Sequence, residues 1–157
     1  MTTAEILAAW MDEQKVSLLQ KYESSGRKAS GRFGQSVRID NKDAGSQMYG
    51  ASHIWQMVNG RAPNQNQSPD AIRRWVGWAG STFLKDWVQA KGVSASPYAI
   101  AYKIAREGIK VPNANNDGRL LQDTLYSDTA REDLARRIGR NFILDVKQQI
   151  QQIWQQV

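Results

Sequence analysis

Two serine–proline pairs, at positions 68–69 and 96–97, constrain the fold of this chain most strongly. A serine side chain can cap a helix, and proline is favoured at the first helical position because the N–H that it lacks would be unpaired there. Each pair is followed by apolar residues at helical spacing, and each segment ends at a glycine, Gly92 or Gly108. The sequence therefore predicts two helical segments, the first of them bent near residue 80 where glycine and serine weaken it.

The remaining elements are predicted by similar patterns. The segment 3–22 has a helical apolar stripe with Thr3 as its cap, and a capping box of Thr129 and Glu132 begins a continuous helix over 127–157. Alternating residues predict a hairpin of strands 35–40 and 46–51, whereas the apolar segment 53–58 fits a strand or a helical turn. We therefore expect a single α+β domain over 1–157, mainly helical, with a small early β-hairpin and a long C-terminal helix.

Composition narrows the function. The chain has 157 residues, six of them Trp, with 41% hydrophobic residues, 21 Lys and Arg, 15 Asp and Glu, one His and no Cys. The apolar content is too high for a fully disordered chain, and no apolar run approaches the roughly 18 residues of a membrane span. The absence of Cys excludes disulfides and thiolate chemistry. The net charge of +6 suggests an anionic neighbour, either nucleic acid or an acidic protein surface.

Catalytic and metal-binding patterns are missing from the sequence. No phosphate-binding glycine loop, nucleophile elbow or paired-histidine zinc motif occurs. The run 113–118 begins like a calcium loop, but Thr124 stands where a bidentate Glu is needed, so an Asx-rich turn is expected. His53 is expected to be a partly buried structural residue. We expect no catalytic residue, metal or cofactor; an enzyme with an unrecognised carboxylate site is the weakest hypothesis.

A glycine- and serine-rich segment over 24–38 contains basic residues and no acidic ones. We predict that residues 24–34 form a flexible loop that leads into the first strand. The loop is expected to contact the phosphates of DNA without reading its sequence, or to dock on an acidic protein. The simpler alternative is a loop that is only solvated. The four basic residues of the segment are Arg27, Lys28, Arg32 and Arg38. A second basic group, at 131–140, is expected to be a solvated helix face, partly neutralised by Glu132–Arg136 and Asp133–Arg137 pairs.

The C-terminal helix has an unusual polar face. Glutamine, rather than Lys or Glu, lies between apolar residues at helical spacing, and uncharged amides are buried by a partner at lower cost than charges. The pattern therefore favours a subunit interface, with ordinary packing within the chain as the alternative. Six Trp also exceed the needs of one small core, so some are expected to be interface anchors. The interface candidates are Trp55, Ile150, Ile153 and Trp154.

Two short motifs resemble a known family. The segment IWQMVNGRAPN at 54–64 and the pattern A-I-A-x-K-I-x-x-E-G at 99–108 are similar to those of head–tail joining proteins of tailed bacteriophages, also called neck, tail-completion or minor tail proteins. The resemblance covers about residues 35–125. It assigns no particular residue to DNA or to the portal.

The resemblance implies a small α+β subunit of the virion, made in the host cytoplasm. It would assemble as a homo-oligomeric ring, of six- or twelve-fold symmetry, at the head–tail junction. Its partners would be the portal and tail or neighbouring neck proteins, with packaged DNA in the lumen, and it implies no catalysis, cofactor, membrane or small-molecule substrate. The alternative is a small non-specific nucleic-acid-binding protein that uses the basic loop 24–38.

Overall fold

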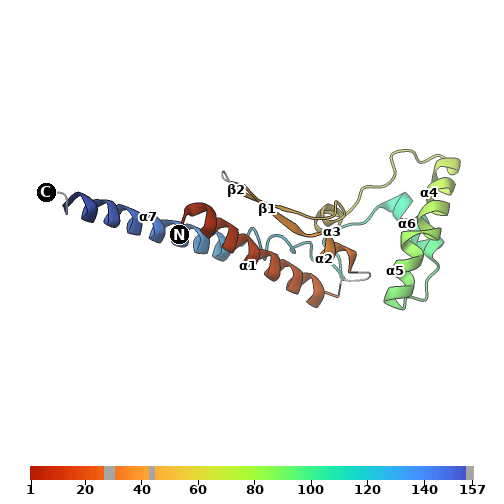
Figure 1. The fold of residues 1–157 in the computed structure, drawn as a ribbon. Helices are drawn as coiled ribbons and strands as arrows, with labels where there is room; N and C mark the ends of the chain where they lie inside the picture. The colour runs from red at the N-terminus through yellow and green to blue at the C-terminus, as the bar shows by residue number, and fades with distance from the viewer. Residues whose placement is uncertain (27–30, 43–44, 155–157) are drawn as a thin grey trace. The chain divides into compact units, whose positions relative to one another are not determined.

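The computed structural model describes residues 1–26, 31–42 and 45–154. It is mainly helical with a two-stranded antiparallel sheet near the N-terminus and a long C-terminal helix, which confirms the predicted α+β class (Figure 1). Contacts divide the chain into two compact units. Unit 1 comprises Met1–Lys21, Val37–Tyr49 and Leu121–Val157; unit 2 comprises Tyr22–Ser36 and Gly50–Leu120. The single domain expected from chain length stays a prediction.

Unit 1 combines helix α1 (Thr3–Ser24), which continues into unit 2, with strands β1 (Arg38–Lys42) and β2 (Gly45–Tyr49) and helix α7 (Asp128–Trp154). Its core contains Trp10 and Met11 of α1 and Ala130 of α7, with side chains of the hairpin packed against them. The hairpin pairs Arg38 with Tyr49 and Lys42 with Gly45. From α7, Ala130 and Leu134, both near its N-terminal end, belong to this core.

The helix caps of unit 1 differ from the predicted ones by one or two residues. Thr2, rather than Thr3, forms a capping box with Glu5: the Glu5 N–H donates to Thr2 Oγ1 at 3.2 Å, and the Thr2 N–H donates to Glu5 Oε2 at 2.7 Å. At α7 the Ala130 N–H donates to Ser127 Oγ at 3.1 Å, so Ser127 takes the role expected of Thr129. Both runs offer neighbouring hydroxyl residues, and sequence does not say which will leave the helical conformation.

The predicted loop over 24–34 is wrong at both ends. Helix α1 extends to Ser24, and Arg32–Ser36 form a short helix, α2, where loop and strand were expected. The cause is tertiary: the Phe33 ring is buried, with its centroid 4.7 Å from that of Tyr22. Strand β1 therefore starts at Arg38 rather than at residue 35. Arg27 and Lys28 lie outside the described residues.

Unit 2 contains α2 and four more helices: α3 (Ile54–Asn59), α4 (Pro69–Ser81), α5 (Phe83–Lys91) and α6 (Pro97–Glu107). Helices α4, α5 and α6 surround a core of Ala79, Leu84 and Ala101. The Ser68 cap is confirmed, because Ser68 Oγ accepts a hydrogen bond from the Ala71 N–H at 3.4 Å. The predicted bend is a break at Thr82, which separates α4 from α5.

None of the helices in the described part of the chain is long and apolar enough to cross a membrane.

Candidate functional site

The C-terminal half of α7 is exposed. The N-terminal half is held against α1 by Arg137, whose guanidinium donates to both Glu13 carboxylate oxygens at 2.8 and 2.7 Å and to Asp133 at 2.8 Å. The hydrogen bond from Arg137 lowers the pKa of Glu13. Beyond Arg137, α7 continues past α1 (Figure 1). The large apolar side chains exposed there are Phe142, Ile143, Leu144, Val146, Ile150 and Trp154.

Four of these side chains form one stripe. Ile143, Val146, Ile150 and Trp154 are spaced at i, i+3, i+7 and i+11, which places them on one helix face. Trp154 is 78% exposed. The segment 141–154 contains only two charged residues, Asp145 and Lys147. A stripe of this kind on a helical segment with few charges is typical of a surface that another protein covers. We call it the α7 stripe.

The predicted interface residues lie in both units. Ile150 and Trp154 are in the α7 stripe, and the side chain of Ile153 lies outside the described residues. Trp55 is in α3 of unit 2, where it is 57% exposed.

The predicted basic group is divided between the units. Arg32 is an exposed residue of α2 in unit 2, 4.0 Å from Asp86. Arg38 is the first residue of β1 in unit 1, where its guanidinium lies 5.1 Å from the centre of the Tyr49 ring.

Positive charge is concentrated in unit 2. By sequence, unit 2 has 12 Lys and Arg against five Asp and Glu, whereas unit 1 has nine against ten. Arg74, Lys103 and Arg106, all in α4 or α6, form no ion pair with any residue that the structure describes. The division does not follow from the order of residues, because each unit is assembled from separate segments of the chain. The whole net charge of the protein therefore belongs to one unit.

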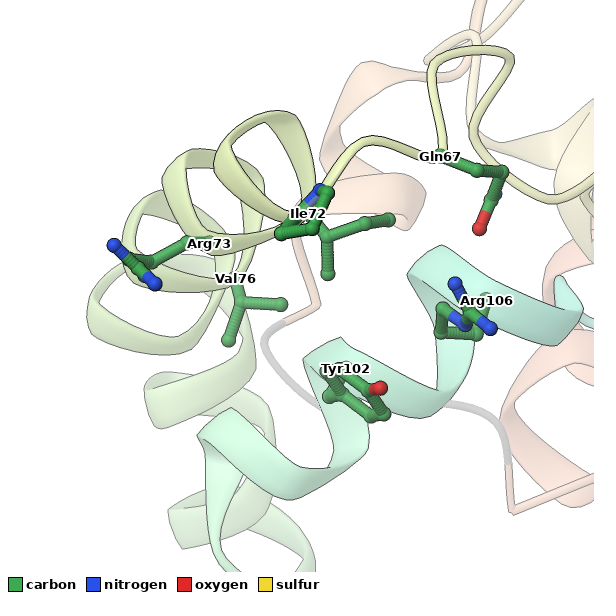
Figure 2. Close-up of a pocket in the computed structure, with 7 residues that line it drawn as sticks. Gln67, Ile72, Arg73, Val76, Tyr102 and Arg106 are labelled. Atoms are coloured by element: carbon green, nitrogen blue, oxygen red, sulfur yellow. The ribbon is translucent and has the colours of Figure 1, made fainter.

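Part of this charge borders a small pocket between α4 and α6. Figure 2 shows Arg73 and Arg106 at the two sides of the pocket, with Ile72, Val76 and Tyr102 between them. The pocket has a volume of about 390 Å³. Basic groups beside an exposed aromatic ring suit the phosphates and bases of a nucleic acid.

Unit 2 also contains a larger pocket of about 1030 Å³, which we call the aromatic pocket. Trp78 and Phe83 line it and contact each other edge to face, with ring centres 5.5 Å apart. The pocket is also lined by three positively charged residues, Arg32, Arg61 and Lys91, and by one negatively charged residue, Asp86. The apolar residues that define it include Phe33, Trp75, Trp78, Phe83, Trp87, Ile100 and Ile104. The surplus of Trp in the sequence was the available signal for this pocket.

The two motifs that carry the family resemblance meet in unit 2. Arg61 and Ile109 form an antiparallel bridge, with N–O distances of 2.8 and 2.7 Å. Gly60 and Gly108, which precede them, have φ values of 78° and 76°. A Cβ on Gly60 would lie 2.1 Å from the backbone oxygen of Ile109, and one on Gly108 would lie 2.2 Å from that of Arg61. Both positions therefore require glycine.

Arg61 is a structural residue at this crossing. Its guanidinium lies 4.6 Å from the centre of the Trp75 ring and donates to Asn64 Oδ1 at 2.6 Å and to the Ile104 carbonyl at 3.4 Å. Burial lowers the pKa of Arg61. These contacts join the loop after α3 to α4 and α6, the helices that line both pockets.

The Asx-rich loop forms as expected, whereas His53, expected to be partly buried, is exposed. Its ring still contacts Phe33 edge to face at 5.6 Å, and partial desolvation, followed by the charge of Arg32, lowers the pKa of His53 below 6.5. In the loop, the N–H groups of Asn115 and Gly118 donate to Asn113 Oδ1 and Asn116 Oδ1, which are Asx turns. Within residues 1–26, 31–42 and 45–154, no cluster of three or more His, Asp or Glu could hold a metal ion.

Comparison of this chain with protein-family models, with curated proteins and with solved structures finds no match.

Proposed function

We propose that this protein is a structural virion subunit that forms a ring at the head–tail junction of a tailed phage. The ring would connect the portal to the tail or to neighbouring neck proteins around the DNA channel. The observation that carries the proposal is the α7 stripe, a helix face whose Ile143, Val146, Ile150 and Trp154 are exposed on a nearly uncharged segment. The resemblance of the 54–64 and 99–108 motifs to head–tail joining proteins supplies the biological setting.

In this role the protein acts by binding rather than by turnover. The α7 stripe provides contact between subunits, because burying apolar surface contributes roughly 25 cal/mol per Å². The excess of basic residues in unit 2 would lie toward packaged DNA, whose phosphates attract Lys and Arg without regard to sequence.

Mass measurement tests the proposal. Light scattering coupled to size exclusion, and native mass spectrometry, should detect oligomers of the purified chain or a complex with the portal of its own phage. Ile150→Lys should weaken assembly, whereas Gln148→Lys, with the same new charge on the opposite helix face, should not. A chain that stays monomeric and binds neither portal nor tail protein would refute the proposal.

The charge of unit 2 favours a second candidate, a small non-specific nucleic-acid-binding protein. Affinity for duplex DNA should then fall steeply with salt, because each neutralised phosphate releases counterions. The basic loop hypothesis expects that neutralising Arg27, Lys28, Arg32 and Arg38 abolishes binding.

The structure offers a matched comparison on α4 and α6. Neutralising Arg73, Arg74, Lys103 and Arg106 removes the same number of charges from α4 and α6 of unit 2 instead. If only this second set lowers DNA affinity and the salt slope, DNA binds at α4 and α6. If the unmodified chain does not bind duplex DNA, the nucleic-acid candidate is rejected. If it binds and neither set lowers the affinity, neither surface is the binding site.

A further inference from the structure

We propose that the α7 stripe of one copy binds in the aromatic pocket of a second copy. The inference rests on the proposed function and names the two surfaces by which subunits would contact each other. The stripe lies in unit 1 and the pocket lies in unit 2, so each copy has one of each.

The stripe has the form of a helix that binds in a groove. Helices bound in this way use apolar anchors at i, i+3 or i+4 and i+7. Ile143, Val146 and Ile150 match this spacing, and Trp154 extends it by one turn. Trp is one of the residue types enriched among those that dominate binding energy, and Trp154 is exposed. The stripe therefore has the anchors needed to fill an apolar groove.

The aromatic pocket suits a helix better than a small molecule. Its volume of about 1030 Å³ lies at the upper limit of the range for small ligands, roughly 300–1000 Å³, so it has room for several side chains of a protein segment. Trp78 is 58% exposed and Phe83 and Trp87 are also exposed, so their rings are accessible to a partner. Aromatic rings are enriched in the centre of protein interfaces, where they bury large areas. These properties indicate a protein segment as the occupant.

Charge also favours this pairing. The carbonyl end of a helix has a partial negative charge, and the last turn of α7 contains no basic residue. The charged residues of the pocket are Arg32, Arg61, Lys91 and Asp86, which give it a net positive charge. The C-terminal end of α7 and the border of the pocket therefore have opposite signs.

The symmetry of such a contact agrees with a ring. When two different surfaces of one chain bind each other, each copy has a free surface for the next, and the series closes if the rotation between copies permits. A contact between two identical α7 stripes would instead stop at a dimer.

Mixing two variants tests the inference. Ile150→Lys disrupts the stripe but keeps the pocket, and Trp78→Ala disrupts the pocket but keeps the stripe. Both residues are exposed, so both variants should fold, as far-ultraviolet circular dichroism can verify. Each variant alone should associate at least about 10-fold more weakly than the unmodified chain, whereas their mixture should form a 1:1 dimer that does not grow. Gln148→Lys and Tyr102→Ala, matched changes outside the two surfaces, should assemble normally.

Other results would overturn the inference. If Trp78→Ala assembles as well as the unmodified chain while Ile150→Lys does not, two α7 stripes bind each other as a dimer and the inference is wrong. If the unmodified chain is monomeric, or if neither variant changes its assembly, the stripe does not bind the pocket of a second copy. Binding to the portal then decides the proposed function separately.

Cross-linking gives a second measurement, which detects the contact between copies even when they associate weakly. The chain has no Cys, so Gln151→Cys, beside the stripe, and Asp86→Cys, at the border of the pocket, each introduce one thiol and keep the apolar anchors. After the two preparations are mixed and oxidised, disulfide-linked pairs should contain one copy of each variant. Linked pairs of two Gln151→Cys chains, in excess over mixed pairs, would contradict the inference.

Discussion

Replacing Gly108 by alanine tests the crossing of the two family-like motifs. Gly108 has φ 76° and ψ −163°, a conformation that only glycine adopts readily, and a Cβ there would lie 2.2 Å from the Arg61 backbone oxygen. The backbone strain costs about 1–3 kcal/mol. Moving Arg61 away breaks two backbone hydrogen bonds to Ile109, each contributing about 1 kcal/mol. We expect Gly108→Ala to lower the free energy of unfolding by about 3–5 kcal/mol.

Thermal unfolding provides the assay. A loss of this size corresponds to a melting temperature lower by about 10 °C for a chain of this length. Four of the six Trp lie in unit 2, so their fluorescence reports mainly on that unit. Gly92→Ala is the matched control: Gly92 also has a positive φ, 63°, but a Cβ there would meet nothing within 4 Å. It should cost only about 1 kcal/mol. If the two variants have the same melting temperature, the close contact between Gly108 and the Arg61 backbone does not contribute to stability.

Three further predictions concern stability. Gly77→Ala should stabilise unit 2 by up to about 1 kcal/mol in urea unfolding, because Gly77 lies inside α4 and the new Cβ would meet nothing within 4 Å. If the variant is less stable, the space around Gly77 is not open. Desolvation lowers the pKa of His53 in the folded chain, so the unfolded chain binds more protons near pH 6. The stability contributed by neutral His53 is therefore present above about pH 6.5 and decreases as the pH falls through the pKa of folded His53. Urea midpoints measured across this pH range should show the decrease, and His53→Gln should abolish the pH dependence. Arg137→Ala should lower the melting temperature of unit 1 more than Arg136→Ala, because only Arg137 bonds to Glu13. Arg137 lowers the pKa of Glu13 from 4.5, so this difference should disappear once acid protonates Glu13. If the difference persists in acid, the effect of Arg137 comes from packing and not from the ion pair.

The sequence predicted the elements whose signals are local. Ser68 and Pro69 begin α4 as expected, and Gly92 and Gly108 follow the ends of α5 and α6. The ion pair between Asp133 and Arg137 is also confirmed, because helix spacing alone brings these residues together.

The features that sequence could not predict depend on distant contacts. Helix α2 has no apolar period and exists where Phe33 packs on Tyr22. The described structure contains no ion pair between Glu132 and Arg136, while Arg137 bonds to Glu13 of another helix. The aromatic pocket and the positive charge of unit 2 arise from segments separated in the chain, so patterns along the sequence did not reveal them.

The crossing at Gly60 and Gly108 has an evolutionary consequence. A Cβ on either glycine would meet main-chain atoms, of Ile109 at Gly60 and of Arg61 at Gly108. A smaller neighbouring side chain therefore cannot make room for a larger residue at either position. We therefore expect descendants of this chain to retain both glycines together, even where the surrounding helices have diverged beyond recognition.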